Sequence, residues 1–148
     1  MLRRTHGAQP WTAPGVSDLM RVLVIDDDDS IREFVSLALA DEGYDVHSAT
    51  DGQAALNLIA TDPPDLILLD MRMPVMDGWE FARRYRERPG PQAPIVVITA
   101  AHEAANRAAQ IGAQDHLSKP FKLESLFDLV EKYAGLSPHG GDRSAQSG

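Results

Sequence analysis

Polar side chains that could act together follow four short runs that are typical of β-strands. They are Asp26, Asp27, Asp70, Thr99 and Lys119. If the runs are parallel strands of one sheet, their carboxyl ends share an edge, which is where α/β proteins bind ligands. Three carboxylates held close together repel one another, so either one takes up a proton or a divalent cation binds among them. Oxygen ligands without His or Cys suit Mg²⁺ or Mn²⁺, and not Zn²⁺.

This set of groups suits phosphoryl transfer, in which cations neutralise the transferring group while a nucleophile lies in line. Asp70 could be that nucleophile and form an acyl phosphate, needing no general base because it is already ionised. Asp27 would hold the metal, and Asp26 would help directly or through water. Lys119 and the Thr99 hydroxyl would contact the phosphoryl oxygens. The sequence contains no Cys nucleophile, GxSxG elbow, GxGxxG loop or P-loop for the other common α/β chemistries.

The segment around Asp70 reads DLILLDMRMPVMDG. Its apolar run, residues 66–69, is typical of a strand buried on both faces. Pro74 cannot continue a strand ladder, and Gly78 tolerates backbone dihedrals that other residues resist. The pattern therefore predicts that Asp70 lies at the carboxyl end of a strand, with a turn leading away from it.

The rest of the chain alternates between strand and helix periods. Strands are predicted at 21–26, 45–49, 66–70, 95–99 and 115–118. Helices are predicted from Asp29 or Ser30 to just before Gly43, and at 51–60, 78–88, 103–111 and 123–133. Five strand–helix units predict a single-domain, doubly wound α/β fold, a parallel sheet covered by helices on both faces.

For several other side chains, a structural role is the simplest interpretation. Asp28 and Asp29 suit the solvated start of a helix, where acidic residues are favoured. Asp77 is expected to cap the third helix. The first helix is expected to bury one apolar face, and aromatic residues of the third helix to pack in the core. These two sets are Ile31, Phe34, Val35, Ala38 and Leu39, and Trp79, Phe81 and Tyr85.

Length and composition limit the class of protein that this chain can be. The chain has 148 residues, enough for one domain, and a net charge of −8 without a basic stripe, which argues against direct binding of nucleic acid. It has no cysteine, which excludes disulfides and thiolate metal sites but says little about compartment. It has no apolar run long enough to span a membrane and no signal-peptide core near its N-terminus, so a cytoplasmic protein is the default expectation. Residues 20–134 are expected to form the domain, with disordered segments at 1–19 and 135–148. Met20, directly before the first strand, is an alternative to Met1 as the native start.

Four motifs in register carry a family resemblance: VLVIDDDDSIRE, LILLDMRMPVMDG, IVVITA and LSKPF. They strongly resemble the receiver domain of two-component response regulators, over about residues 20–133. The resemblance implies the flavodoxin-like, CheY-like fold with strand order 2-1-3-4-5. It also implies that Asp70 accepts a phosphoryl group from a phosphohistidine on a sensor histidine kinase or a histidine phosphotransfer protein.

The resemblance further assigns roles to individual positions. It implies that Mg²⁺ is held by Asp27, Asp70 and the backbone carbonyl of Arg72, with Asp26 assisting. Thr99 matches the switch hydroxyl of the family, and Lys119 matches its phosphate-contacting lysine. The bond between Lys119 and Pro120 is expected to be cis.

The position three residues before the lysine departs from the family pattern. It usually holds Tyr or Phe, which moves inward with the switch hydroxyl, but here it is His116. His116 could pack as a partial ring, or it could make the switch sensitive to pH. The simpler expectation is that it faces solvent and has no switching role. Arg72 and Ala101 fall where the family tunes the lifetime of its phosphoryl group.

The functional expectation is a stand-alone receiver domain of a two-component or phosphorelay system, monomeric or weakly dimeric. It is expected to assist its own phosphorylation and dephosphorylation and not to be an enzyme. It would signal to a downstream protein through the face made by the fourth helix, fifth strand and fifth helix. One alternative is a receiver-like module that binds partners constitutively and is never phosphorylated. Another is a phosphatase of the haloacid dehalogenase type, which would need a second Asp where this chain has Arg72.

Overall fold

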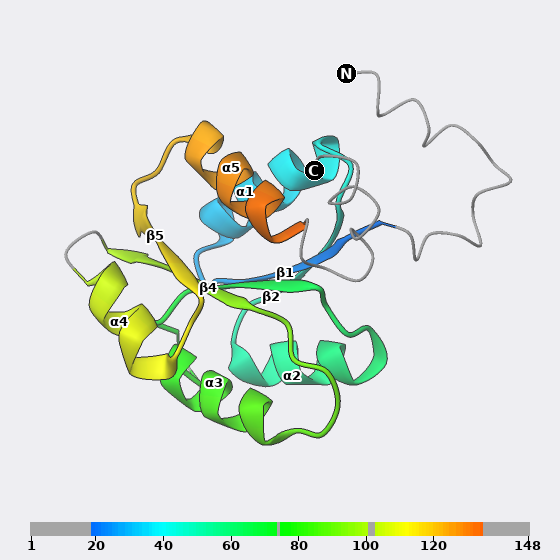
Figure 1. Cartoon of the computed structure of the whole chain (residues 1–148), viewed down its shortest axis with the longest axis vertical. Coiled ribbons are helices and arrows are strands. Elements are labelled where there is room, and N and C mark those ends of the chain that lie inside the picture. Colours follow the sequence, from blue (N-terminus) through cyan, green and yellow to red (C-terminus); the bar gives the residue numbers. More distant parts are fainter. Residues whose placement is uncertain (1–18, 74, 101–102, 135–148) are drawn as a thin grey trace, which may run out of the picture.

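The computed structural model describes residues 19–73, 75–100 and 103–134. Within these ranges the chain forms one parallel sheet in the order β2-β1-β3-β4-β5. Figure 1 shows this sheet between its helices. The strands are β1 (Arg21–Ile25), β2 (Asp45–Ala49), β3 (Leu66–Leu69), β4 (Ile95–Ala100) and β5 (Asp115–Lys119). This is the predicted doubly wound α/β fold, and its strand order is the one implied by the resemblance.

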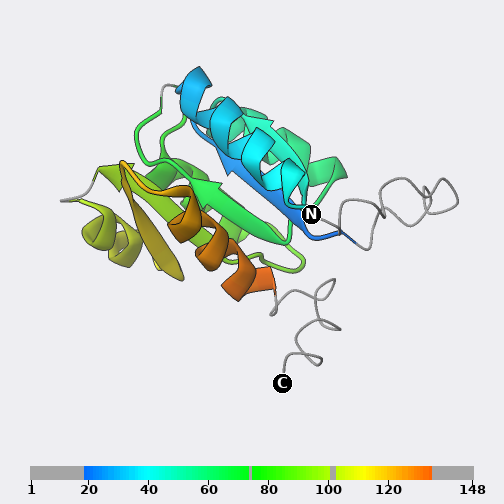
Figure 2. The same cartoon turned by 90° about the horizontal axis from the view of Figure 1, so that it is seen from above.

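Helices cover both faces of the sheet, as Figures 1 and 2 show from two directions. One face carries α1 (Asp29–Asp41) and α5 (Leu123–Ala134). The other face carries α2 (Gly52–Thr61), α3 (Gly78–Glu87) and α4 (Ala104–Ile111). No helix among the described residues is long and apolar enough to cross a lipid bilayer.

Alternation along the strands builds two separate cores. Leu23, Ile25, Ile67, Leu69, Ile95 and Val97 point toward α2 and α3. Their neighbours Val22, Val24, Leu66, Leu68, Val96 and Ile98 point toward α1 and α5. Because both sets are buried, β1, β3 and β4 read as nearly continuous apolar runs in the sequence. The central strands are thereby held firmly, and their carboxyl ends become a rigid platform.

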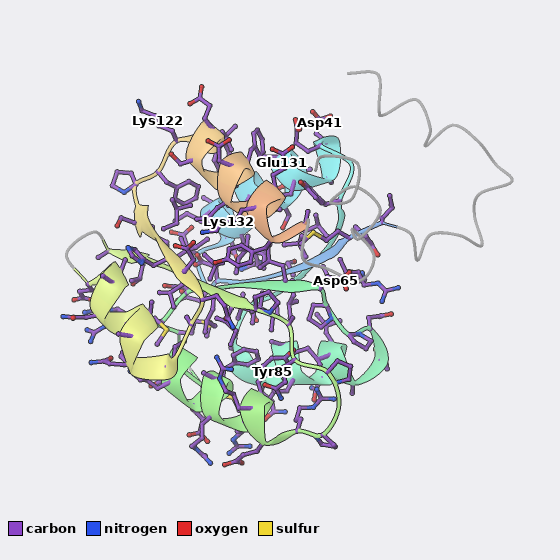
Figure 3. The ribbon with its side chains drawn as sticks, viewed as in Figure 1. Asp41, Asp65, Tyr85, Lys122, Glu131 and Lys132 are labelled. Atoms are coloured by element: carbon purple, nitrogen blue, oxygen red, sulfur yellow. The ribbon has the colours of Figure 1, made fainter. Side chains whose placement is uncertain are left out.

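The packing of α3 shows how side chains extend this core. Phe81 and Tyr85, one helical turn apart, are buried and stacked with ring centroids 5.7 Å apart. Tyr85 is labelled in Figure 3, and its hydroxyl accepts a hydrogen bond of 2.7 Å from the backbone N–H of Ala93. Asp77 caps α3, as predicted, by accepting a hydrogen bond from the backbone N–H of Glu80.

The first helix differs from its prediction at two points. Its N-cap is Asp28, not Asp29 or Ser30, because the Asp28 carboxylate accepts hydrogen bonds from the backbone N–H groups of Ser30 and Ile31. Phe34, predicted on the buried face, is 51% exposed. The helix lies on the sheet along Val35 and Leu39, which leaves Phe34 at the margin of that contact.

The other element boundaries lie within one or two residues of those predicted, as is normal for helix and strand ends. Notably, β5 includes Lys119, whereas the prediction ended that strand at residue 118. The prediction of a disordered tail at 135–148 lies outside the described residues, as does that for 1–19 apart from Leu19.

Candidate functional site

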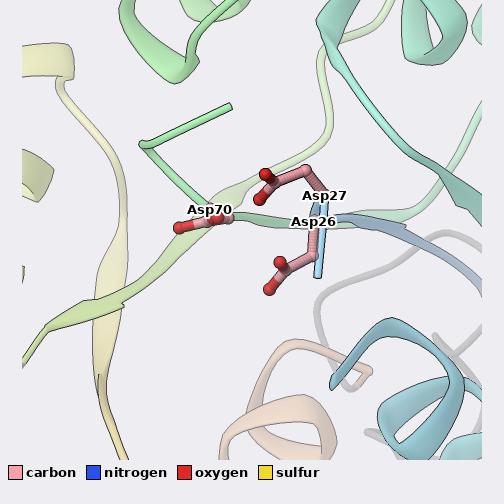
Figure 4. Close-up of side chains that lie close together, drawn as sticks. All are labelled: Asp26, Asp27 and Asp70. Atoms are coloured by element: carbon pink, nitrogen blue, oxygen red, sulfur yellow. The ribbon is translucent and has the colours of Figure 1, made fainter. Parts of the chain in front are cut away.

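Three carboxylates converge at the carboxyl edge of the sheet. Asp26 and Asp27 follow β1, and Asp70 follows β3, the strand paired with β1. One carboxylate oxygen from each lies within 4.8 Å of the others, and Figure 4 shows the three side chains together. Asp26 and Asp70 are buried, whereas Asp27 is exposed. The structure therefore brings together the acidic cluster that the strand ends predicted.

Lys119 completes the cluster from the end of β5. Its Nζ lies 3.1 Å from Asp26 Oδ2 and 3.7 Å from Asp70 Oδ1. One ammonium group thus lies beside two buried carboxylates and offsets part of their mutual repulsion. The Lys119–Pro120 peptide bond, expected to be cis, is cis in the structure.

Main-chain hydrogen bonds hold the acidic residues in place. The N–H of Asp70 donates to the carbonyl of Ile25 over 2.9 Å, which ties the end of β3 to β1. The N–H of Asp28 donates to Asp26 Oδ1 over 2.9 Å, so the turn into α1 fixes that carboxylate. Arg32 Nη1 donates to the Asp26 carbonyl over 2.8 Å. Sequence reasoning missed this positioning role of Arg32, whose only local signal was a basic residue in the first helix.

Burial changes the acidity of Asp70. The pKa of its carboxyl is raised from 3.8 to about 6, mainly by removal from water and next by the neighbouring Asp26, while Lys119 opposes the shift. The backbone N–H of Arg72, 3.4 Å from Asp70 Oδ1, also lowers this pKa. At neutral pH the Asp70 carboxylate is therefore mostly ionised, although burial and its neighbouring carboxylates disfavour its charge. An added cation would offset the repulsion between these carboxylates.

The acidic cluster opens into a cavity of about 810 Å³. Thr99, a buried residue of β4, lines this cavity together with Asp70 and Lys119. The remaining lining residues are Asp26, Asp27, Asp28, Ile31, Phe34, Arg72, Ala100, Glu103, Pro120 and Phe121. The lining thus combines the carboxylates and Lys119 with the apolar side chains of Phe34 and Phe121.

Two further predicted positions have different surroundings. Arg72 lies at the cavity mouth, where its Nη2 is 3.1 Å from Glu103 Oε2. His116 is exposed on β5, an edge strand, and does not line the cavity. Ala101 lies outside the described residues. Glu103 is a second residue that sequence reasoning missed, because its contact with Arg72 joins positions 31 residues apart.

The donor set fits a hard divalent cation. Three carboxylates supply oxygen atoms close enough to share one ion, and no His or Cys belongs to the cluster. Mg²⁺ prefers oxygen ligands and keeps several of its own waters, which suits a site that opens into a cavity. The buried Asp70 and Asp26 carboxylates are the groups that gain most from the added positive charge.

Comparison with known proteins places this fold and site in one family. Residues 22–131 match the family described as the response regulator receiver domain. The chain therefore belongs to the receiver domain family of two-component response regulators, the class of phosphoacceptor signalling domains.

Individual relatives agree with this assignment. The chain is 46% identical over 109 residues to response regulator MprA of Mycolicibacterium vanbaalenii, covering 72% of this chain and 47% of that protein. It is 45% identical over 130 residues to response regulator MprA of Mycobacterium ulcerans, covering 86% and 56%. The chain thus spans about half the length of these curated relatives.

A solved structure of the chemotaxis response regulator CheY4 of Vibrio cholerae superimposes with a TM-score of 0.71 at 36% identity. That match covers 78% of this chain and 98% of the CheY4 chain. The Francisella response regulator 1452 receiver domain gives a TM-score of 0.70 at 32% identity, over 77% and 95% of the two chains.

Proposed function

We propose that the chain is a phosphorylation-driven switch in which Asp70 accepts a phosphoryl group from a phosphohistidine of a sensor histidine kinase or histidine phosphotransfer protein. The observation that carries this proposal is the position of Asp70, buried beside two carboxylates and one ammonium group at the floor of an open cavity. Membership of the receiver domain family supports it.

In the proposed step, a carboxylate oxygen of Asp70 attacks phosphorus in line with the bond to the imidazole nitrogen. A P–O bond forms as the P–N bond breaks, and the nitrogen keeps the electron pair of that bond. The donor reacts with its other ring nitrogen protonated, so it leaves as a neutral imidazole. Lys119 would stabilise the equatorial phosphoryl oxygens, because its ammonium already lies 3.7 Å from Asp70 Oδ1. The Thr99 hydroxyl would donate to another of these oxygens.

Asp26, Asp27, Asp70 and the backbone carbonyl of Arg72 would hold Mg²⁺. When bound, the ion supplies positive charge against the phosphoryl oxygens. The protein's own contribution is to keep the carboxylates together: the Asp28 N–H and Arg32 hold Asp26 and its turn, and the Asp70 N–H bond to Ile25 holds the end of β3.

The output would be a changed protein–protein contact on the surface formed by α4, β5 and α5. This surface adjoins the site because Thr99 and Ala100 end β4 shortly before α4, and Lys119 ends β5 shortly before α5. A group that binds to Asp70 therefore lies next to the segments from which α4 and α5 begin.

Intact mass after incubation with phosphoramidate, which has a P–N bond as phosphohistidine does, tests the proposal. The wild type should gain one phosphoryl group when Mg²⁺ is present and lose it again with time. Asp70→Asn should gain none. Asp62→Asn, which alters a carboxylate at the end of α2 outside the acidic cluster, is the matched control and should behave as the wild type.

Two other outcomes would reject the proposal. A wild type that never gains mass, with or without Mg²⁺, would support a constitutive binding module. Steady release of phosphate from unrelated phosphate monoesters would support the phosphatase alternative.

A further inference from the structure

A line of charged side chains leads from the phosphoryl-accepting cavity to α4. Arg72 Nη2 lies 3.1 Å from Glu103 Oε2 and 3.5 Å from Glu103 Oε1. Arg107 Nη2, one helical turn further on, lies 3.2 Å from Glu103 Oε1. The Arg72 side chain is 69% exposed, whereas that of Glu103 is 17% exposed. Glu103 is thus a largely buried carboxylate between two guanidinium groups, of which that of Arg72 is the more exposed.

Arg107 carries the line on to α3. Its guanidinium lies 4.9 Å from the centroid of the Trp79 ring, within the range of a cation–π contact. The Trp79 Nε1 donates to Gln110 Oε1 on α4 over 2.9 Å. Among the described residues, the buried Nε of Arg107 has no hydrogen-bond partner. Arg107 therefore has a spare donor, close to the carboxylate that its Nη2 already contacts.

The helix between these contacts is lightly anchored. Only Ala104 and Ala108 of α4 are buried, and their small side chains contribute little apolar area. Its C-terminal end is held by Arg86, whose Nη2 donates to the carbonyls of Ile111 and Gly112. At the N-terminal end, Glu103 connects α4 to Arg72. A change at Glu103 should therefore move the N-terminal end of α4 more than its C-terminal end.

Phosphorylation of Asp70 would offer Arg72 a second anion to pair with. Arg72 and Glu103 line the same cavity as Asp70. Phosphorylation would replace the single charge of Asp70 by about two charges on a phosphoryl group. A guanidinium pairs well with a phosphoryl group, through two parallel hydrogen bonds, and that dianion competes strongly with a carboxylate. The same added charge repels the Glu103 carboxylate.

We propose that Arg72 exchanges Glu103 for the phosphoryl group on Asp70, and that Glu103 then turns fully to Arg107, using the spare Nε donor, and shifts the N-terminal end of α4. This inference rests on the proposed function. It adds Arg72 as a side chain that binds the phosphoryl group, and Glu103 as the positioning residue that moves α4 when Arg72 leaves it. The two arrangements form a two-state element, biased by the charge on Asp70.

The exchange would explain how this chain can have His116 where the family usually has Tyr or Phe. His116 is exposed on the edge strand and lies outside the cavity, so it offers no buried ring that must follow Thr99. The contact between Arg72 and Glu103 reaches the start of α4 without such a ring. In this chain, α4 would therefore respond to charge as well as to the position of the Thr99 hydroxyl.

Trp79 fluorescence gives a direct readout of the exchange, because Arg107 lies over its ring and Gln110 binds its N–H. Trp11 is the other tryptophan of the chain, so Trp11→Phe leaves Trp79 as the sole emitter. In this background, emission is recorded before and after treatment with phosphoramidate and Mg²⁺. The change is divided by the fraction phosphorylated, taken from intact mass of the same sample.

Glu103→Gln removes the charge that binds both arginines and should reduce the Trp79 response per phosphorylated molecule at least about threefold. Arg72→Met should reduce it to a similar extent. Glu87→Gln is the matched control, because Glu87 pairs with Arg83 at 3.2 Å on the surface of α3, apart from this line. It should keep the full response.

Two results would overturn the exchange. One is a full Trp79 response per phosphorylated molecule in both Glu103→Gln and Arg72→Met. The other is a phosphorylated wild type without any Trp79 response. If the wild type gains no phosphoryl mass at all, the proposed function itself fails, and the mass record distinguishes that outcome from a failure of the exchange alone.

Discussion

Lys119 Nζ lies 3.1 Å from Asp26 Oδ2, although 93 residues separate them in the chain. The contact is possible because β1 and β5 end at the same edge of the parallel sheet. It places the site's one ammonium group among the carboxylates, where it offsets their repulsion and competes with any divalent cation for the same oxygens.

Because of this competition, substitutions of Lys119 and Asp27 should change the affinity for Mg²⁺ in opposite directions. We expect Lys119→Met to bind Mg²⁺ more tightly than the wild type, because the competing ammonium is gone, yet to take up the phosphoryl group about 100-fold more slowly. Asp27→Asn should weaken Mg²⁺ binding at least about tenfold, because it removes a charged ligand. Calorimetric titration with Mg²⁺ and the rate of mass gain measure the two effects. A Lys119→Met variant with weaker Mg²⁺ binding would contradict this division.

The raised pKa of Asp70 predicts that, in the absence of Mg²⁺, the free energy of unfolding depends on pH. Burial raises this pKa from 3.8 to about 6, so between these values the folded chain holds a proton that the unfolded chain has released. The contribution of Asp70 to stability is therefore lost as pH rises through this window, by on the order of 3 kcal/mol. Asp70→Asn should thus gain stability over the wild type between pH 4 and pH 7 without Mg²⁺.

Urea unfolding of both proteins across this pH range measures the difference. Adding Mg²⁺ at pH 7 should stabilise the wild type and leave Asp70→Asn nearly unchanged, because the ion binds the folded carboxylate cluster. A difference between the two proteins that does not depend on pH would show that Asp70 titrates normally in the folded chain.

Gly78 should resist substitution more than Gly52, although both begin helices and both are buried. A Cβ added at Gly78 would lie 2.8 Å from the backbone Cα of Met71, next to Asp70. At Gly52 the nearest atoms belong to the movable side chain of Met76. Gly78→Ala should cost about 2–3 kcal/mol and Gly52→Ala clearly less.

Urea unfolding compares the two alanine variants with the wild type, and Mg²⁺ titration shows whether the Asp70 loop has moved. Equal losses of stability would mean that the Met71 backbone yields as readily as the Met76 side chain.

Replacing Val75 should stabilise the fold, because its backbone conformation is unfavourable for valine. Its φ is 66°, in the left-handed region that a β-branched residue rarely adopts, and its side chain is 85% exposed. Val75→Asn should therefore stabilise the fold by about 1 kcal/mol, because Asn tolerates this conformation and little burial is lost. Val75→Ile retains β-branching and is the control, with no expected gain. A denaturation midpoint for Val75→Asn below that of the wild type would contradict the strain.

Much of the architecture follows from local patterns. Apolar runs such as residues 66–69 can be buried on both faces only in a covered parallel sheet, so the alternation of elements predicts the fold class. Parallel strands end at one edge, so Asp26, Asp27 and Asp70 are predicted to meet before any distance is known. The resemblance adds the strand order, which the structure confirms.

The sequence by itself therefore determined the class of fold and the acidic cluster, because periodicity and strand-end positions are local properties of the chain. Tertiary structure alone decided that Phe34 faces the cavity mouth, that Arg32 holds the Asp26 carbonyl, and that Glu103 pairs with Arg72. The rotation of α1 on the sheet and the approach of α4 to the loop after β3 set these contacts. Both depend on packing between distant segments, which leaves no periodic trace in the residues that it brings together.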